Sequence, residues 1–231
     1  MRPGASVSSS RQAQMAEEAL LRAHGYQVAA AFFLSPPTQE FLEALAANPV
    51  APVPVDPAWR LEELVQEFHN LFLVPTGCYV FPFESCYEGR TESGPGLLMG
   101  RPARQVQEFY RRAGFELSPA LKELPDHAGV EISLLQALAE RQAAAWEAGD
   151  AEQAGRWSEM ENEFFNRHPG RWIPGLCAEI QSRTRERYYA GMADWIAEWF
   201  AGSDATAEER PAGVKFPGGG KRRDSTPGRT G

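Results

Sequence analysis

The chain has 231 residues, of which 31 are acidic and 23 are basic, so its formal net charge is −8. This balance argues against nucleic acid as the main partner, because phosphate binding needs a basic surface. No apolar run reaches the length of a membrane span, and the first residues lack the apolar core of a secretory signal. Cys78, Cys86 and Cys177 have no CxxC spacing, which favours a reducing compartment. We therefore expect a cytoplasmic protein without stable membrane insertion.

The two ends of the chain differ in composition from the middle. Residues 1–9 are small and polar, and residues 202–231 are rich in Gly, Pro, Ser, Thr and charge. Such segments bury too little apolar surface to offset the entropy of ordering them. We therefore predict disordered ends at 1–9 and 202–231, and one folded domain over residues 10–201.

The first part of this domain has helical periodicity. The pattern Ser9-x-x-Gln12 resembles a capping box and predicts a helix that runs to about Phe33. A short helix is expected around residues 41–45, after two prolines. Asp56 is then expected to cap a third helix, with a proline in its first turn. The apolar residues of that helix recur at helical spacing: Leu61, Leu64, Val65, Phe68, Leu71 and Phe72.

Residues 74–102 form a long connection with prolines at 75, 82, 95 and 102 and several glycines. A structureless loop of this length inside a compact domain is usually functional or mobile. Its aromatic residues lie on no periodic face. Two interpretations stay open, because these side chains could plug the bundle or line a groove for an apolar peptide. The aromatic residues are Tyr79, Phe81, Phe83 and Tyr87.

The second half of the domain predicts further helices. One runs from about Ala103 and ends at Gly114, and the next covers residues 130–148. The pattern Asp150-x-x-Gln153 predicts the capped start of another helix. Pro169-Gly170 is expected to end it, and two more helices follow over residues 174–184 and 184–200. No pair of alternating strands is found, so we predict an all-α fold with a single helical bundle and one long Pro/Gly-containing loop.

Asp126, His127 and Glu131 stand together at the expected start of a helix. His127 and Glu131 are four residues apart and share a helix face, so they could form a metal site or an acid–base pair. The alternative is a capping network in which Asp126 accepts backbone N–H groups and His127 pairs with Glu131. The corresponding enzyme would be a metal-dependent helical one that uses His127, Glu131, Glu163 and His168. The chain contains no HExxH, GxSxG, P-loop or dinucleotide-binding pattern.

Five segments, in order, resemble those of the TorD/DmsD/NarJ family of chaperones for molybdenum redox enzymes. They are Glu67-Phe68-His69-Asn70-Leu71-Phe72-Leu73-Val74-Pro75, Phe81-Pro82-Phe83-Glu84-Ser85-Cys86-Tyr87, Tyr110-x-x-x-Gly114-Phe115, Pro125-Asp126-His127 with Glu131, and His168-x-x-x-Trp172-x-Pro174. The Pro-Asp-His segment is the most specific of them. Two positions depart from the family pattern, because Val74 stands where Gly is usual and Phe83 where Tyr is common.

The resemblance implies an all-helical chaperone rather than an enzyme, without a metal or cofactor of its own. Its partner would be the precursor of a molybdopterin-containing catalytic subunit, bound through its twin-arginine leader, through another part of the apo enzyme or through both, and held until the cofactor is inserted. The acidic net charge is consistent with such a leader, which has a basic start and an apolar middle. The residues carried over as client contacts are Leu71, Phe72, Pro75, Phe81, Pro82, Glu84, Ser85, Tyr87, Asp126, His127, Glu131, His168 and Trp172.

Overall fold

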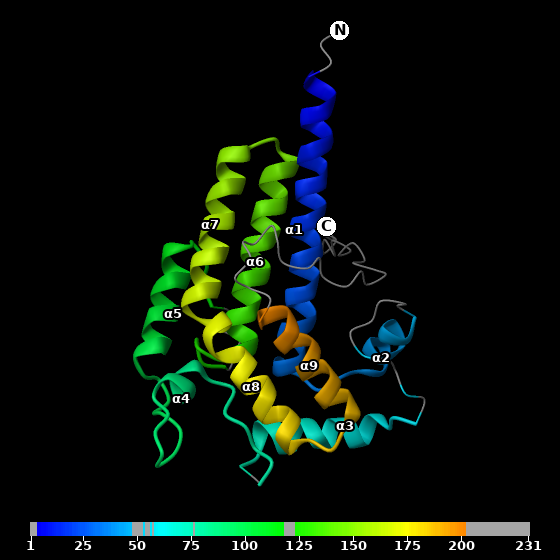
Figure 1. Ribbon diagram of the computed structural model, residues 1–231, viewed down its shortest axis with the longest axis vertical. Coiled ribbons are helices and arrows are strands. Elements are labelled where there is room, and N and C mark those ends of the chain that lie inside the picture. The colour runs from blue at the N-terminus through cyan, green and yellow to red at the C-terminus, as the bar shows by residue number, and fades with distance from the viewer. Residues whose placement is uncertain are drawn as a thin grey trace, which may run out of the picture.

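The computed structural model describes residues 4–47, 53, 56, 58–75, 77–117 and 123–201, and the predicted tail at 202–231 lies outside them. In this part of the chain the structure has nine α-helices, one π-helical turn and no β-strand (Figure 1). The predicted all-α class is therefore confirmed. None of the described helices combines the length and the apolar character that crossing a membrane requires.

Three long helices form the upright part of the bundle (Figure 1): α1 (Gly4–Leu34), α6 (Ala128–Glu147) and α7 (Ala151–Arg167). α6 packs along α1, and α7 packs along α6. α1 begins at Gly4, five residues before the expected capping position. Gly25 does not end this helix; a Cβ there would lie 2.2 Å from the ring of Trp199, so glycine permits close packing.

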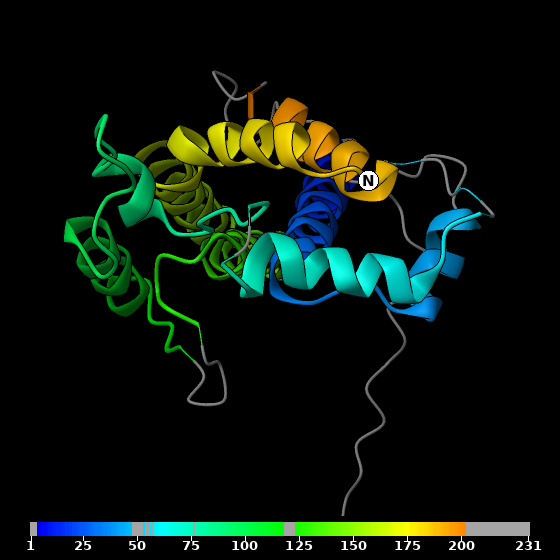
Figure 2. The same cartoon turned by 90° about the horizontal axis from the view of Figure 1, so that it is seen from below.

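The remaining helices surround the lower end of the bundle in Figure 1. α8 (Pro169–Arg183) packs against α9 (Arg187–Ala201), while α2 (Gln39–Ala46) lies to one side and α5 (Arg101–Arg112) to the other. α3 (Leu61–Phe68) continues into the π-helical turn η1 (His69–Leu73). Figure 2, seen from below, shows α3 crossing this end of the molecule. A short helix, α4 (Glu84–Glu88), lies within the long connection.

Two further predicted helix starts were wrong. Asp56 does not cap α3; its carboxylate accepts a hydrogen bond from the Ala58 N–H at 2.8 Å and forms a local turn. The helix begins at Leu61 instead. α8 begins at Pro169, where a break was expected, because proline suits a first helical turn that needs no N–H donor.

Two other helix boundaries agree with the prediction. The Asp150 carboxylate accepts a hydrogen bond from the Gln153 N–H at 2.9 Å and caps α7. Gly114 has a φ of +73° just after α5, in the left-handed region that glycine adopts without strain. Both features depend on residues within three or four positions of each other, which explains why the sequence predicts them.

Aromatic residues fill the core between α1, η1 and α9. The ring of Phe72 lies 5.9 Å from Phe32 and 5.1 Å from Phe68, measured between ring centroids. Tyr189 donates a hydrogen bond to the Leu64 carbonyl at 2.7 Å, so its hydroxyl is satisfied although the residue is fully buried. This core fixes the end of α3 and η1, from which the long connection departs.

Candidate functional site

The start of α4 meets the start of α6 through Asp126. The Asp126 carbonyl accepts a hydrogen bond from the Glu84 N–H at 2.9 Å, and its Oδ2 accepts one from the Ser85 N–H at 3.0 Å. Asp126 therefore caps α4, a helix 41 residues away in sequence, and not the helix that follows it. The expectation that Asp126 caps its own helix was wrong, although a capping role for this side chain is correct.

His127 is the residue that caps α6. Its Nδ1 accepts a hydrogen bond from the Gly129 N–H at 3.2 Å. Burial lowers the pKa of His127 to about 4, so the imidazole is neutral near pH 7 and Nδ1 can act as an acceptor. The predicted pairing of His127 with Glu131 is absent: the nearest carboxylate of His127 is that of Glu123, with 3.9 Å between Nε2 and Oε2.

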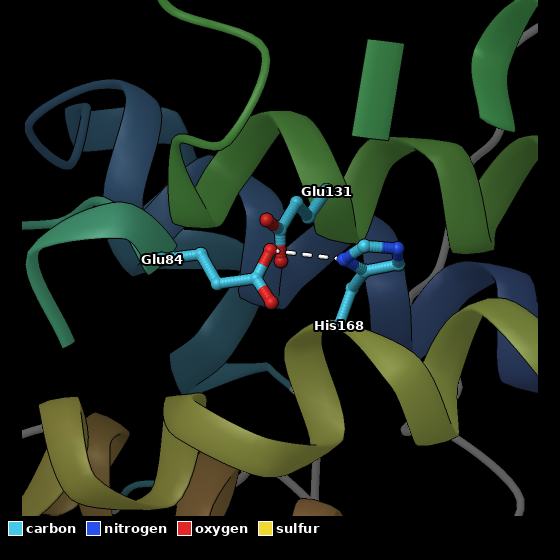
Figure 3. Close-up of side chains that lie close together, drawn as sticks. All are labelled: Glu84, Glu131 and His168. Carbon is cyan, nitrogen blue, oxygen red and sulfur yellow. Dashed lines mark hydrogen bonds and ion pairs between the residues drawn. The ribbon is translucent and has the colours of Figure 1, made fainter. Parts of the chain in front are cut away.

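A cluster of buried polar groups lies where α4, α6 and the junction of α7 with α8 meet (Figure 3). His168 Nδ1 and Glu84 Oε2 are 2.9 Å apart. Trp172 donates its indole N–H to Glu131 Oε2 at 2.9 Å. We call Glu84, Asp126, Glu131, His168 and Trp172 the buried junction, because together they join the short helix α4 to the bundle.

Electrostatics at the buried junction favour a proton on Glu131. Burial, followed by the negative charge of Glu84, raises the pKa of Glu131 well above its usual range. Two neighbouring carboxyl groups in a dry environment cannot both ionise cheaply. Glu131 therefore keeps its proton at a higher pH than an ordinary carboxyl, while Glu84 faces the His168 ring.

Of the four residues of the predicted metal enzyme, the structure brings Glu131 and His168 together, but not with His127 and Glu163 as a single site. His127 is used in the cap of α6, and Glu163 lies on the surface, where it pairs with Arg112 at 2.6 Å and Arg167 at 2.7 Å. A different set, Glu84 with Glu131 and His168, places three possible ligand atoms within 4.8 Å of one another. His168 Nδ1 and Glu131 Oε2 already have protein partners there, whereas Glu131 Oε1 has none among the described residues.

A second buried polar group was missed by the sequence reasoning. Arg22 of α1 pairs with Glu161 of α7, with 3.2 Å between Nη2 and Oε2. Arg22 also donates to Gln142 of α6, and Tyr26 donates to Glu161 at 2.9 Å. We call these four residues the arginine clamp, since they tie three long helices together. Arg22 is one of several charged residues of α1, so the sequence did not single it out.

The predicted client contacts fall into two groups by exposure. Ten of them are buried: Leu71, Phe72, Pro82, Glu84, Ser85, Asp126, His127, Glu131, His168 and Trp172. Phe81 and Tyr87 are half-buried, and Pro75 is exposed. Direct contact with a partner is therefore open to the last three in this conformation. The buried ones shape the surface from beneath, and their role in client binding stays a prediction.

Tyr87 holds α4 against α8. Its hydroxyl donates to Glu179 Oε2 at 2.7 Å, and Arg90 donates to the same oxygen at 2.9 Å. The Arg90 guanidinium also lies 4.5 Å from the centroid of the Tyr87 ring. On the other side, the rings of Tyr87 and Trp172 are 5.2 Å apart. The side chain is thus a bridge between the surface and the buried junction.

The residues of the buried junction come from three of the five segments that carried the family resemblance, and a comparison with family models agrees. Residues 33–178 match the model described as nitrate reductase delta subunit. The chain belongs to this family. The resemblance to molybdoenzyme chaperones seen in the sequence is therefore confirmed, and the buried junction lies within the matched region.

Relatives of this delta-subunit family member include proteins named chaperone protein TorD. The one from Vibrio cholerae El Tor is 28% identical over 115 residues, which are 50% of this chain and 49% of that protein. The one from Psychrobacter is 26% identical over 167 residues, 71% of this chain and 68% of that protein. The chain thus spans about half the length of the Vibrio cholerae relative. These relatives are named as chaperones and not as enzymes. No solved structure matches the chain.

Proposed function

We propose that this protein is a cytoplasmic chaperone for the catalytic subunit of a molybdopterin-containing redox enzyme. In this proposal it binds the apo subunit, including a twin-arginine leader, and delays export until the cofactor is inserted. Family membership and the names of the relatives support the chaperone class. The precursor, the leader and the timing are what the family resemblance implies, and the chemistry of the surface is consistent with the leader.

The observation that carries the proposal is an apolar surface next to an acidic one on a continuous helix. Leu73 and Val74, at the end of η1, are 55% and 48% exposed. Glu63 and Glu67 lie earlier on the same helix, in α3. Leu73 is the last residue of η1, six positions after Glu67, which is on the order of 10 Å along a helix, and Val74 follows in extended conformation. We call this surface the α3–η1 ridge.

Negative charge is concentrated at the acidic end of the ridge, where Glu63, Glu67 and Glu186 lie close enough to interact. Burial and the charges of Glu67 and Glu63 raise the pKa of Glu186, a residue just before α9. A cationic partner would relieve this repulsion. A twin-arginine leader offers positive charge followed by an apolar stretch, so its two parts complement the two ends of the ridge.

A second exposed apolar segment lies at the same lower end of the molecule in Figure 1. Leu97, Leu98 and Met99, in the loop before α5, are 86%, 51% and 49% exposed. Consecutive exposed apolar residues of this kind are typical of a surface that a partner covers. This loop is fixed to α4, because Gly96 donates a hydrogen bond to the Cys86 carbonyl at 2.9 Å.

Calorimetry with a synthetic twin-arginine leader tests the proposal. Saturable binding with a negative change in heat capacity is expected, because apolar surface is buried. Changing both Leu73 and Val74 to Ser should weaken binding, whereas Leu20→Ser, at an exposed apolar position on α1, should not. Glu63→Gln should reduce the salt dependence of binding more than Glu147→Gln at the far end of α6.

A second experiment distinguishes binding of the leader from binding of the rest of the client. An apo catalytic subunit with its leader removed is tested for binding and for cofactor uptake in the presence and absence of the chaperone. Uptake that rises with the chaperone supports the maturation role. If the protein binds neither the leader nor the apo subunit of any molybdoenzyme from the same organism, the proposed function is contradicted.

A further inference from the structure

A basic cleft lies on the side of the molecule formed by α5, α7 and the start of α8. Two adjoining hollows of about 370 and 510 Å³ share four lining residues: Arg101, Gln105, Arg167 and His168. We call the two hollows together the arginine cleft. Volumes of this size are typical of sites for small molecules.

The charge of the cleft is opposite to that of the whole protein. Five arginines line it against two glutamates, in a chain whose net charge is −8. The arginines are Arg101, Arg104, Arg112, Arg167 and Arg171, and the glutamates are Glu88 and Glu108. Clustered positive charge repels itself, so its concentration at one concave place favours a bound anion.

Not all of these arginines are neutralised by the protein. Arg112 and Arg167 share Glu163, and Arg171 pairs with Glu88 at 3.2 Å. Among the described residues, Arg101 and Arg104 have no ion-pair partner. They lie in the first turn of α5, where no acidic residue is present and where positive charge opposes the helix dipole. A bound anion would remove both penalties.

The base of the cleft is His168 of the buried junction. Its side chain is 4% exposed, and its Nδ1 is held by Glu84. Figure 3 shows that the second ring nitrogen, Nε2, points away from Glu84. Within the described part of the chain, no hydrogen bond is made to Nε2. His168 therefore lines both hollows and has one ring nitrogen without a hydrogen-bond partner among the described residues.

From this arrangement we propose that the arginine cleft binds a multiply charged oxyanion of the phosphate class. Guanidinium groups present paired N–H donors that match phosphate oxygens, and their number here suits a ligand with two or more charges better than a single carboxylate. Arg101 and Arg104 provide the free positive charge, and His168 Nε2 provides a fixed polar contact. The proposal does not depend on the proposed α3–η1 ridge, because none of the residues that line the cleft belongs to α3 or η1.

Calorimetric titration of the full chain with inorganic pyrophosphate tests this proposal at low salt, in a buffer without phosphate or sulfate. One saturable site is expected. The double change Arg101→Gln with Arg104→Gln should weaken binding by at least about tenfold, the usual result of removing charge-assisted hydrogen bonds. The matched control is Arg156→Gln with Arg185→Gln, which removes two exposed arginines outside the cleft and should leave binding within about twofold. Melting temperatures verify that both variants fold.

A second measurement locates the anion without any substitution. The chain has four histidines, so the imidazole NMR signals can be assigned individually. Pyrophosphate should shift the ring signals of His168 and leave those of His24 on α1 in place. The proposal is overturned if wild type shows no saturable binding, if both double variants lose affinity equally, or if His168 does not respond. Binding of an acidic peptide without binding of pyrophosphate would also overturn it.

Discussion

The arginine clamp and the buried junction both place charge inside the protein, but they satisfy it to different degrees. In the clamp, Glu161 receives Arg22 and Tyr26, and Arg22 also reaches Gln142. In the junction, Asp126 Oδ1 and Glu131 Oε1 have no hydrogen-bond partner among the described residues. An unsatisfied buried polar atom costs free energy, so the clamp is the better compensated of the two.

The clamp and the junction, which differ in how completely their polar groups are hydrogen-bonded, also lie in different parts of the fold. The clamp ties α1, α6 and α7, which form the long and extensively packed part of the bundle. The junction joins the five-residue helix α4 to α6 and α8, next to the loops that carry the exposed apolar residues. Compensated charge therefore occurs within the long helices of the bundle, and incompletely compensated charge occurs where the short helix α4 joins them. Substitutions at Arg22, His127, Glu131 and Asp126 test whether the two regions behave differently.

The largest expected effect is at the clamp. Arg22→Met should lower the free energy of unfolding by about 3–5 kcal/mol, because it leaves the Glu161 carboxylate buried without its cation. Urea unfolding measures this loss. Replacing Glu161 by Gln in the same chain should recover part of it, since the uncompensated charge is then removed. If Arg22→Met is nearly neutral, the pair is not the compensated core that its geometry indicates.

Part of this contrast could be predicted from the sequence. The caps at Asp150 and Gly114, and the helical class as a whole, depend on short-range patterns, and these were correct. The partner of Arg22 is 139 residues away and the partner of Asp126 is 41 residues away. Helical periodicity reports only on residues a few positions apart, so the sequence could not predict these long-range partners.

The helix α4 was missed for a related reason. It has five residues, between a proline at 82 and a glycine at 89, so its length is below what periodicity can detect. Its first turn is capped by Asp126 from another segment, not by a residue of its own. The long connection was correctly singled out as unusual. Its contribution to a buried polar cluster followed only from the tertiary structure.

The next prediction concerns the pH dependence of stability at the start of α6, where the pKa of His127 is lowered and that of Glu131 is raised. The folded pKa of His127, about 4, is below the ordinary value of about 6.5, so its neutral form stabilises the fold above pH 6.5. That stability is lost as the pH falls from 6.5 towards 4, by about 3 kcal/mol. His127→Asn keeps a capping side chain but does not titrate. Its free energy of unfolding should therefore fall less than that of wild type between pH 6.5 and 4.

Glu131 provides the matched comparison. Its folded pKa is raised, so its protonated form stabilises the fold at low pH, and this contribution is lost as the pH rises above the ordinary value of about 4.3. The free energy of unfolding of Glu131→Gln should therefore increase relative to that of wild type as the pH rises, the reverse of the trend for His127→Asn. Urea unfolding of the three proteins between pH 4 and 8 measures both slopes. Parallel profiles would show that neither group is as strongly perturbed by burial as its position indicates.

The smallest expected effect separates capping from recognition at Asp126. Asp126→Ala removes the acceptor of the Ser85 N–H and should cost about 0.5–2 kcal/mol, the usual loss for a helix cap. Asp126→Asn keeps an oxygen acceptor for that N–H, so its melting temperature should stay close to that of wild type. Because Asp126 is completely buried, its charge has no direct access to a leader, and leader affinity should follow α4 stability in both variants. Loss of leader binding in the folded Asn variant would instead mean that the junction opens and that Asp126 contacts the client itself.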